Sequence, residues 1–337
     1  MWPSCDAWSH PRRTLVTPVQ PPVRRLPGRS VGAVVTDDTA PLRLGLVTPV
    51  VSLNPRAHGE WERTATPADL VAVARAADRA GMHHLTCSQH VAVPVDVEAR
   101  RGHRYFDPLA TLSWLAAATE HIRLASHVLV LGLHHPLGIV KSWGTLDRLS
   151  GGRVVLGVGV GTLAEEFDLL GARFEGRGTR ADEAIAAIRA SWGRPVPEFH
   201  GEGLDFADMV IDPTATSGTV PIWVGGRTRR SLRRALELGD GWVPFGMDDD
   251  AVALALSWGR DRPLREPGTA FEVILTAEGL DPVAEPGACG DRLAGLAALG
   301  ATMVNVRMVH RSVAECIEQV EAVTEVAAGI GAGPATW

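Results

Sequence analysis

The feature that most constrains the fold of this chain is a regular alternation of short apolar segments with amphipathic ones, starting at Pro41. The short segments are continuous apolar runs rich in β-branched residues, as expected for strands that are buried on both faces. They cover residues 42–48, 83–88, 122–129, 153–158, 221–224, 241–245, 271–276 and 301–308. Strands that alternate with helices are joined by right-handed crossovers and form a parallel sheet.

The segments between these strands carry apolar residues at helical spacing. The first is the clearest, because Thr66 can cap the first turn, Pro67 suits its first position and Gly81 ends the pattern. Asp107-Pro108 starts a second helix in the same way. Further helices are expected near residues 136–149, 181–192, 228–238, 249–258, 291–299 and 313–328.

Eight strand–helix units in the 296 residues after position 41 predict a TIM (β/α)8 barrel. The alternative is a doubly wound open sheet, which normally carries a glycine fingerprint after its first strand, and residues 46–50 carry none. Residues 161–220, between the fourth and fifth strands, form an enlarged insertion with a short helix, a long helix and the polar stretch 198–218. Because loops at the carboxyl ends of the strands build the active site of a barrel, this insertion is expected to form a lid or a substrate wall.

The first 41 residues differ from the rest of the chain. They contain seven prolines and two arginine pairs, and they lack apolar periodicity. Proline fixes φ and removes a backbone donor, so we expect a disordered tail or a start codon assigned too early. A twin-arginine export signal is disfavoured because the apolar stretch 31–35 is too short. The expected division is therefore a tail over 1–41, a single barrel over 42–330 and a flexible C-terminus over 331–337.

Charge and composition argue against several classes of protein. The net charge of −6 at pH 7 disfavours nucleic acid or an anionic membrane surface as the main partner. No apolar run approaches the roughly 18 residues of a membrane-spanning helix. The four cysteines are scattered without a C-x-x-C pair, which predicts inert thiols in a reducing, cytoplasmic location.

Two glycine-rich segments follow predicted strands. Residues 225–228 combine two glycines, a cation and a capping hydroxyl directly before a helix, a pattern that favours a phosphate site over a simple tight turn. Gly157, Gly159 and Gly161 are weaker evidence for a ligand, since glycine also serves close strand packing.

His90 follows the second predicted strand and would point into the mouth of the barrel, where an imidazole suits proton transfer. A loop histidine more often has a structural or solvated role, and its position alone leaves both interpretations open. A metal hydrolase is disfavoured, because the first strand ends in Thr48-Pro49 rather than in a histidine pair. His134 and His135 are adjacent and would face different ways.

Residues 147–161 read DRLSGGRVVLGVGVG and are followed by Glu165-Glu166-Phe167. PIWVGG at 221–226 and LGDGW at 238–242 continue the pattern. In their order and spacing these motifs strongly resemble the bacterial luciferase-like flavin oxidoreductases. This combination of motifs is most similar to the branch of the family that uses the deazaflavin coenzyme F420. The resemblance spans about residues 42–309.

The resemblance implies a TIM barrel of the bacterial luciferase-like type, with a flavin or deazaflavin in its C-terminal mouth and His90 as the catalytic acid or base. A bulge after the third strand, often with a non-proline cis peptide, would back the ring at residues 126–128. Residues 225–227 would contact the phosphate-bearing tail. The residues implied to bind the cofactor are Gln89, Ser126, His127, Val128, Gly159, Val160, Gly161, Thr162, Glu165, Gly225, Gly226, Arg227 and Thr228.

One position departs from the family pattern. Gln89 stands where the family usually has an aspartate before the histidine, and a glutamine cannot raise the basicity of His90 as a carboxylate would. His127 and His134 are also unusual for the pattern.

The implied function is an F420-dependent oxidoreductase that transfers a hydride between the deazaflavin and a small organic substrate, without a metal. A monooxygenase that uses reduced FMN and oxygen is the first alternative. A deazaflavin-binding protein without catalysis, suggested by Gln89, is the second. Many members of the family that it resembles are dimers, so a homodimer is an open expectation. No residue of the loops identifies the substrate.

Overall fold

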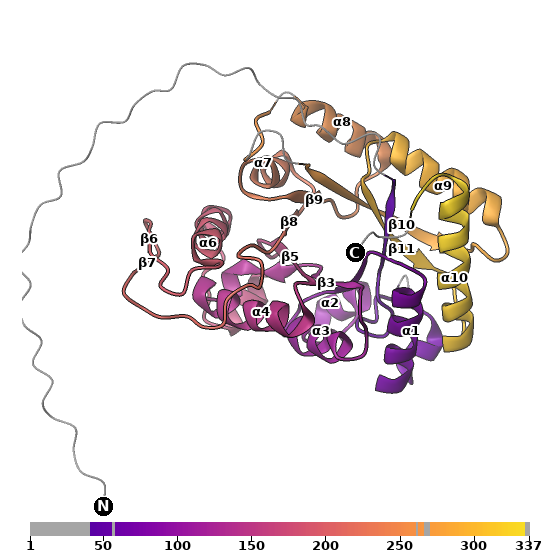
Figure 1. The fold of residues 1–337 in the computed structure, drawn as a ribbon, viewed down its shortest axis with the longest axis horizontal. Helices are drawn as coiled ribbons and strands as arrows, with labels where there is room; N and C mark the ends of the chain where they lie inside the picture. The colour runs from indigo at the N-terminus through magenta and orange to yellow at the C-terminus, as the bar shows by residue number, and fades with distance from the viewer. Residues whose placement is uncertain (1–40, 56–57, 261, 266–269, 334–337) are drawn as a thin grey trace, which may run out of the picture. The chain divides into compact units, whose positions relative to one another are not determined.

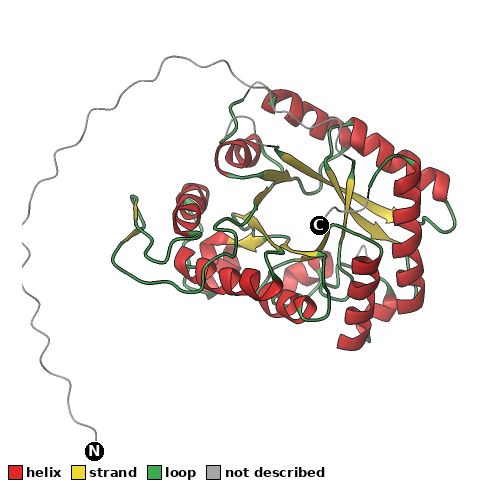
Figure 2. Ribbon diagram, viewed as in Figure 1, coloured by secondary structure: helices red, strands yellow, loops and turns green. Residues whose placement is uncertain are grey.

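The computed structural model describes residues 41–55, 58–260, 262–265 and 270–333. Within them eight parallel strands close into a barrel, in the order β1–β2–β3–β5–β8–β9–β10–β11 and back to β1. Figures 1 and 2 show the strands at the centre and the helices outside. The strands are β1 (Arg43–Leu46), β2 (His84–Cys87), β3 (Arg123–Ser126), β5 (Val154–Gly159), β8 (Ile222–Gly225), β9 (Gly241–Val243), β10 (Glu272–Leu280) and β11 (Met303–Met308).

The closed parallel barrel confirms the predicted fold class and excludes the open sheet. A ninth short strand, β4 (Leu129–Val130), continues β3 after a break of two residues and pairs with β5. β10 runs four residues beyond its predicted end at Thr276, because a register shift between Glu278 and Leu280 lets the strand continue beside β11. Gly279 lies inside this shift at φ 72°, a conformation that glycine adopts without a steric cost.

The described helices cover the outside of the barrel. They are α1 (Pro67–Arg79), α2 (Val95–Arg101), α3 (Pro108–Ala116), α4 (Pro136–Ser150), α5 (Ala164–Leu169), α6 (Arg177–Ser191), α7 (Arg229–Leu238), α8 (Asp249–Gly259), α9 (Pro286–Ala298) and α10 (Val313–Gly329), with short 3-10 turns at Glu60–Arg63 and Leu131–Leu133. The predicted caps form, since Thr66 accepts a hydrogen bond from the Asp69 N–H and Asp107 accepts one from the Ala110 N–H. α2 was not predicted, and α9 begins five residues before its predicted start.

The enlarged insertion lies where it was predicted, between β5 and β8. It holds the short helix α5, the long helix α6 and, within the polar stretch, an antiparallel hairpin of β6 (Phe199–His200) and β7 (Asp205–Phe206). The hairpin extends away from the barrel in Figure 1. α6 packs against α4 and α7, so the insertion is anchored on two outer helices while its beginning, α5, remains beside the end of β5.

Two groups of buried apolar side chains stabilise the barrel. The larger group lies between the strands and the outer helices and includes Leu46, Leu85 and Val304. A smaller group fills the barrel interior and includes Trp223, Ile274 and Met303. Burial on both faces explains why the strands are continuous apolar runs rather than alternating ones.

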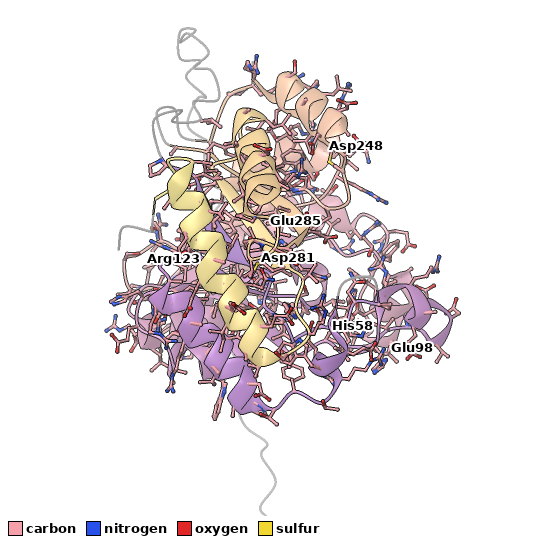
Figure 3. The ribbon with its side chains drawn as sticks, turned by 90° about the vertical axis from the view of Figure 1, so that its right-hand side faces the viewer. His58, Glu98, Arg123, Asp248, Asp281 and Glu285 are labelled. Carbon is pink, nitrogen blue, oxygen red and sulfur yellow. The ribbon has the colours of Figure 1, made fainter. Side chains whose placement is uncertain are left out.

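α1 and α10 pack side by side outside β1, and Figure 3 looks onto this surface. There the Asp281 carboxylate accepts hydrogen bonds from the Gln319 amide at 2.8 Å and the Ala284 N–H at 3.0 Å. At the amino ends of the strands, Arg43 donates two 2.7 Å hydrogen bonds to Glu272. The predicted tail lies outside the described residues apart from Pro41.

Candidate functional site

The carboxyl ends of the strands, called the mouth below, bring His90 and Glu166 together. His90 follows β2, Glu166 belongs to α5 after β5, and His90 Nδ1 lies 2.9 Å from Glu166 Oε2. The other carboxylate oxygen accepts the Val91 N–H at 2.6 Å and the Ala92 N–H at 3.4 Å. Because a carboxylate only accepts hydrogen bonds, the His90 proton lies on Nδ1 and Nε2 is the nitrogen left for a ligand.

Glu166 is 2% exposed. Burial raises the pKa of its carboxyl, but the hydrogen bonds from His90 and the Val91 N–H outweigh burial, so the pKa is lowered. The carboxylate is therefore held ionised behind His90. Glu166 therefore supplies the negative charge beside His90 that the family pattern has at position 89.

Gln89 has a different task from the one that an aspartate would have. Its side chain is buried, its Oε1 accepts the Val130 N–H at 2.7 Å, and its Nε2 lies 2.8 Å from His134 Nε2. An amide can donate on one side and accept on the other, which a carboxylate cannot do. Gln89 thus ties the end of β2 to β4 and to His134, whose pKa is lowered by burial.

Tyr105 forms the side wall of the His90 site. The two rings meet edge to face with centroids 4.7 Å apart, and the Tyr105 hydroxyl donates to the Arg101 carbonyl at 2.8 Å. Arg101 ends α2, so the unpredicted helix positions this wall. Burial raises the pKa of the Tyr105 hydroxyl, which keeps it neutral.

The break between β3 and β4 contains the predicted non-proline cis peptide, at His127–Val128. Val128 packs on Gly159 and Gly225, where a Cβ would approach its methyl groups to 2.7 and 2.9 Å. The side chain of Ser126 does not face the mouth, because it is fully buried and its hydroxyl donates to the Gly157 carbonyl at 2.8 Å. Of the predicted residues at this break, Val128 is the one packed among the glycines of the mouth.

The turn after β5 holds the remaining predicted residues of that strand end. Val160 is partly buried against the core, the Gly161 carbonyl accepts the Arg177 Nε–H at 3.0 Å, and Thr162 is exposed. Glu165 is also exposed and lines a surface cavity of about 450 Å³ with Asp168 and Arg173, apart from His90.

The segment after β8 has the form of an anion site. Gly226 has φ 138°, its N–H donates to the Val243 carbonyl at 3.0 Å, and its carbonyl accepts the Trp242 indole N–H at 2.9 Å. Thr228 caps α7 by accepting the Ser231 N–H at 3.2 Å. Arg227 is exposed and, in the described part of the chain, makes no ion pair. This segment therefore presents a free cation and a helix N-terminus to solvent.

The arginines of α7 divide into two groups. Arg233 and Arg234 are paired with Glu237 and Asp182, respectively. Arg229 and Arg230 are exposed beside Arg227, and Arg229 lies 6.0 Å from the Trp258 ring. Only the first turn of the helix therefore adds positive charge at the predicted phosphate segment.

A chain of polar side chains crosses the apolar interior of the barrel. His83 Nδ1 lies 2.9 Å from His84 Nδ1, His84 Nε2 lies 2.6 Å from Asn305 Oδ1, and Asn305 Nδ2 lies 3.1 Å from His127 Nε2. Gly45 makes room for this chain, because a Cβ there would overlap the His84 ring. Burial lowers the pKa of His84 to about 3 and that of His127 to about 4.

These buried histidines predict acid sensitivity. Between pH 6.5 and about 4 the unfolded chain binds protons at both positions while the folded chain does not, so stability falls as the pH falls. Each histidine contributes a slope of about 1.4 kcal/mol per pH unit in that range. Urea unfolding at pH 4.5–7.5 measures the slope.

The matched comparison for this prediction is His127→Gln against His103→Gln. His127→Gln removes one of the buried histidines whose pKa is lowered, so the acid slope becomes shallower. His103 is exposed beside Glu98 and is not part of the interior chain, so its replacement keeps every buried histidine. An unchanged slope in His127→Gln would contradict the assignment.

Glu166 was missed in favour of its neighbour Glu165, although the sequence held a signal for it. Leu163, Glu166, Phe167 and Leu170 follow the i, i+3, i+4, i+7 spacing of one helix face, and Glu165 falls outside it. In the structure Glu166 and Phe167 are the buried residues of α5. A carboxylate on an apolar face has to find a buried partner, and that partner is His90.

Other candidate chemistry is limited in the described residues. They contain no group of three histidine, cysteine or acidic side chains that could hold a metal ion. Cys87, Cys289 and Cys316 are buried and unpaired, and burial raises the pKa of Cys87 and Cys316 to about 12. None of the helices described is long and apolar enough to cross a membrane.

Known proteins resemble this chain in sequence and in fold. A family model described as luciferase-like monooxygenase matches residues 43–258. An uncharacterized protein of Mycobacterium tuberculosis is 30% identical over 278 residues, 77% of this chain and 93% of the relative. The F420-dependent hydroxymycolic acid dehydrogenase of the same bacterium is 30% identical over 206 residues, 59% of this chain and 56% of its own length.

A solved structure gives the same fold at low identity. The EDTA monooxygenase from Chelativorans sp. BNC1 matches with a TM-score of 0.67 and 13% identity, covering 87% of this chain and 95% of that structure. The likeness extends over the barrel, and at this identity it concerns the fold alone.

Proposed function

Because this chain belongs to the luciferase-like monooxygenase family, whose members are flavin- or deazaflavin-dependent oxidoreductases, we propose that it uses coenzyme F420 to transfer a hydride to or from a small organic substrate. Membership of the family supports the reaction class. The His90–Glu166 pair in the mouth is the observation that supports catalysis, and the similarity to an F420-dependent dehydrogenase favours the deazaflavin as cofactor.

The residues of the mouth fit a cofactor with a planar ring and an anionic tail. Gly159 and Gly225 are buried and leave room for the side chain of Val128, which is half-buried after the cis peptide and offers an apolar side against which a flat ring can pack. Arg227, Arg230 and the N-terminus of α7 offer positive charge for the tail. When bound, a deazaflavin supplies hydride transfer at its ring carbon.

The chain's own residues position a proton near that ring. Glu166 fixes the orientation of the His90 imidazole and places its proton on Nδ1, so Nε2 faces the ligand side as the atom that accepts a substrate proton. Tyr105 packs against the imidazole and limits its movement and its contact with water. A hydride leaving an alcohol carbon requires the hydroxyl proton to leave as well, and His90 Nε2 is placed to receive it.

A monooxygenase that uses reduced FMN and oxygen is the second candidate, and the description of the matching family as luciferase-like monooxygenase favours it. The same mouth would hold the FMN ring and phosphate. Catalytic inactivity, the remaining alternative, rested on the missing charge at Gln89, and the Glu166 carboxylate removes that reason.

Titration of the purified protein with F420 and with FMN, followed by cofactor fluorescence, tests the proposal. F420 is expected to bind, and Arg227→Gln is expected to weaken its binding about tenfold through loss of one charged contact. Arg148→Gln, at an exposed arginine of α4, serves as the matched control and leaves binding unchanged. Tight FMN binding with no response to F420 would refute the deazaflavin proposal in favour of the monooxygenase.

A further inference from the structure

β11 places two polar side chains, Asn305 and Arg307, at successive inward positions of the barrel. Met303 belongs to the interior cluster and Asn305 to the interior histidine chain, whereas Val304 and Val306 pack outward against the helices. Side chains of a strand alternate between its two faces, so Arg307 lies on the inward face. It is one layer nearer to the mouth than Asn305.

Arg307 is half-buried, and its guanidinium has no hydrogen bond or ion pair with any part of the chain that the structure describes. Burial is the main cause of the lowered pKa of His127, and the positive charge of Arg307 adds to it; the same charge opposes the rise that burial causes in the pKa of Tyr105. The strand of Arg307, β11, pairs with β1, and β1 pairs with β2, after which His90 follows, so Arg307 lies on the His90 side of the barrel.

Two buried carboxylates in the segments that follow β1 and β5 are occupied by other donors. Glu166 accepts hydrogen bonds from His90 and two backbone N–H groups, and Glu62 accepts the Val50 and Gly59 N–H groups at 2.6 and 2.7 Å. By contrast, Arg43 at the opposite end of the barrel is paired with Glu272. The positive charge of Arg307 is left without an acidic partner among the residues described.

A half-buried guanidinium without a partner loses part of its hydration and gains nothing in return. Its planar donors match a carboxylate or a phosphate, which can accept two parallel hydrogen bonds. We propose that Arg307 binds an anionic group of the substrate, a carboxylate or a phosphate ester, and so places the reacting carbon beside His90. This inference rests on the proposed function, because it assigns the substrate of the same mouth.

The position around the barrel favours the substrate over the cofactor tail as the source of this anion. The tail segment follows β8, and β9 and β10 separate that strand from β11. By contrast, only β1 separates β11 from β2, the strand that His90 follows. The two positive regions of the mouth thus serve two anions, one at each side.

The first experiment measures anion binding to the cofactor-free protein by calorimetry, with benzoate and inorganic phosphate as probes and benzamide as the uncharged control. The wild-type protein is expected to bind an anion and not benzamide. Arg307→Gln is expected to weaken anion binding at least tenfold and Arg307→Lys to retain part of it. Arg148→Gln is the matched control and binds as the wild type does. Absence of anion binding in the wild type, or equal binding in Arg307→Gln, overturns the proposal.

The second experiment measures F420 binding to the same variants and separates this inference from the proposed function. F420 affinity is expected to stay within about twofold in Arg307→Gln, since a substrate contact adds nothing to cofactor binding. Equal loss of F420 and anion binding would assign Arg307 to the cofactor and overturn the inference. If F420 binds none of the proteins while anion binding still depends on Arg307, the proposed function fails and the anion site stands.

Discussion

Glu166→Gln is expected to lower turnover about 100-fold while F420 affinity stays within about twofold. The substitution keeps the size of the side chain and removes the charge that holds the His90 proton on Nδ1. A neutral amide can offer either its oxygen or its nitrogen to His90, so the imidazole loses its single orientation. Turnover is measured by F420 absorbance with the first active member of a panel of small alcohols and hydroxy acids.

Glu165→Gln is the matched control for this prediction. It changes the adjacent residue of the same helix by the same chemistry, but its side chain is exposed and does not contact His90. Turnover is expected to stay at the wild-type level. Equal losses in the two variants would show that α5 needs negative charge in general, and full activity in Glu166→Gln would remove Glu166 from the catalytic site.

The Glu166 variant also has a readout that needs no substrate. Because the folded-state pKa of Glu166 is depressed, its ionisation stabilises the fold above the unfolded value near 4.5 and this contribution is lost as the pH falls through the folded value. Glu166→Gln therefore flattens the pH dependence of stability below about pH 4.5.

Gly157→Ala is expected to destabilise the barrel by at least about 3 kcal/mol, with a fall of roughly 10 °C in Tm. A Cβ at Gly157 would overlap the backbone carbonyl of Ser126, far inside the 3.0 Å that real Cβ atoms keep. Both backbones belong to barrel strands, β5 and β3, and the Ser126 hydroxyl already joins them. Neither strand can move aside without breaking its ladder. Thermal unfolding followed by circular dichroism measures the loss.

Gly295→Ala provides the contrast. Gly295 lies inside α9, is exposed, and has open space where a Cβ would stand. Alanine favours a helix over glycine, so this variant is expected to gain about 0.5–1 kcal/mol. A Gly157→Ala protein that melts at the wild-type temperature would mean that β3 and β5 are less closely packed than the structure has them.

The barrel could be predicted because each strand is short, apolar and bounded by helix signals that depend on local chemistry. Thr66, Asp107 and Thr228 cap the helices that they were expected to cap. α2 was missed because it is short and buries only Val97, so it has no apolar stripe to detect. The β6–β7 hairpin was missed for a similar reason, since strands of two residues carry no periodicity.

The site was less predictable because its partners come from distant segments. His90 and the cis peptide could be placed from the family motifs, yet the His90–Glu166 contact joins residues 76 positions apart. Arg307 could have been found from the period of two on its strand, where Asn305 and Arg307 interrupt an apolar run. The alternation of side chains along a strand cannot show whether a charged residue on the inward face has an ion-pair or hydrogen-bond partner.

The interior histidine chain has a consequence for the mouth. With all three histidines neutral, the bonds have one consistent direction, because His84 must accept from His83 in order to donate to Asn305. Asn305 then donates to His127 Nε2, and the His127 proton is left on Nδ1. The tautomer of a histidine beside the cis peptide is thereby dictated from the opposite end of the barrel. His83 therefore belongs to the same hydrogen-bond chain as a group of the mouth that it does not touch.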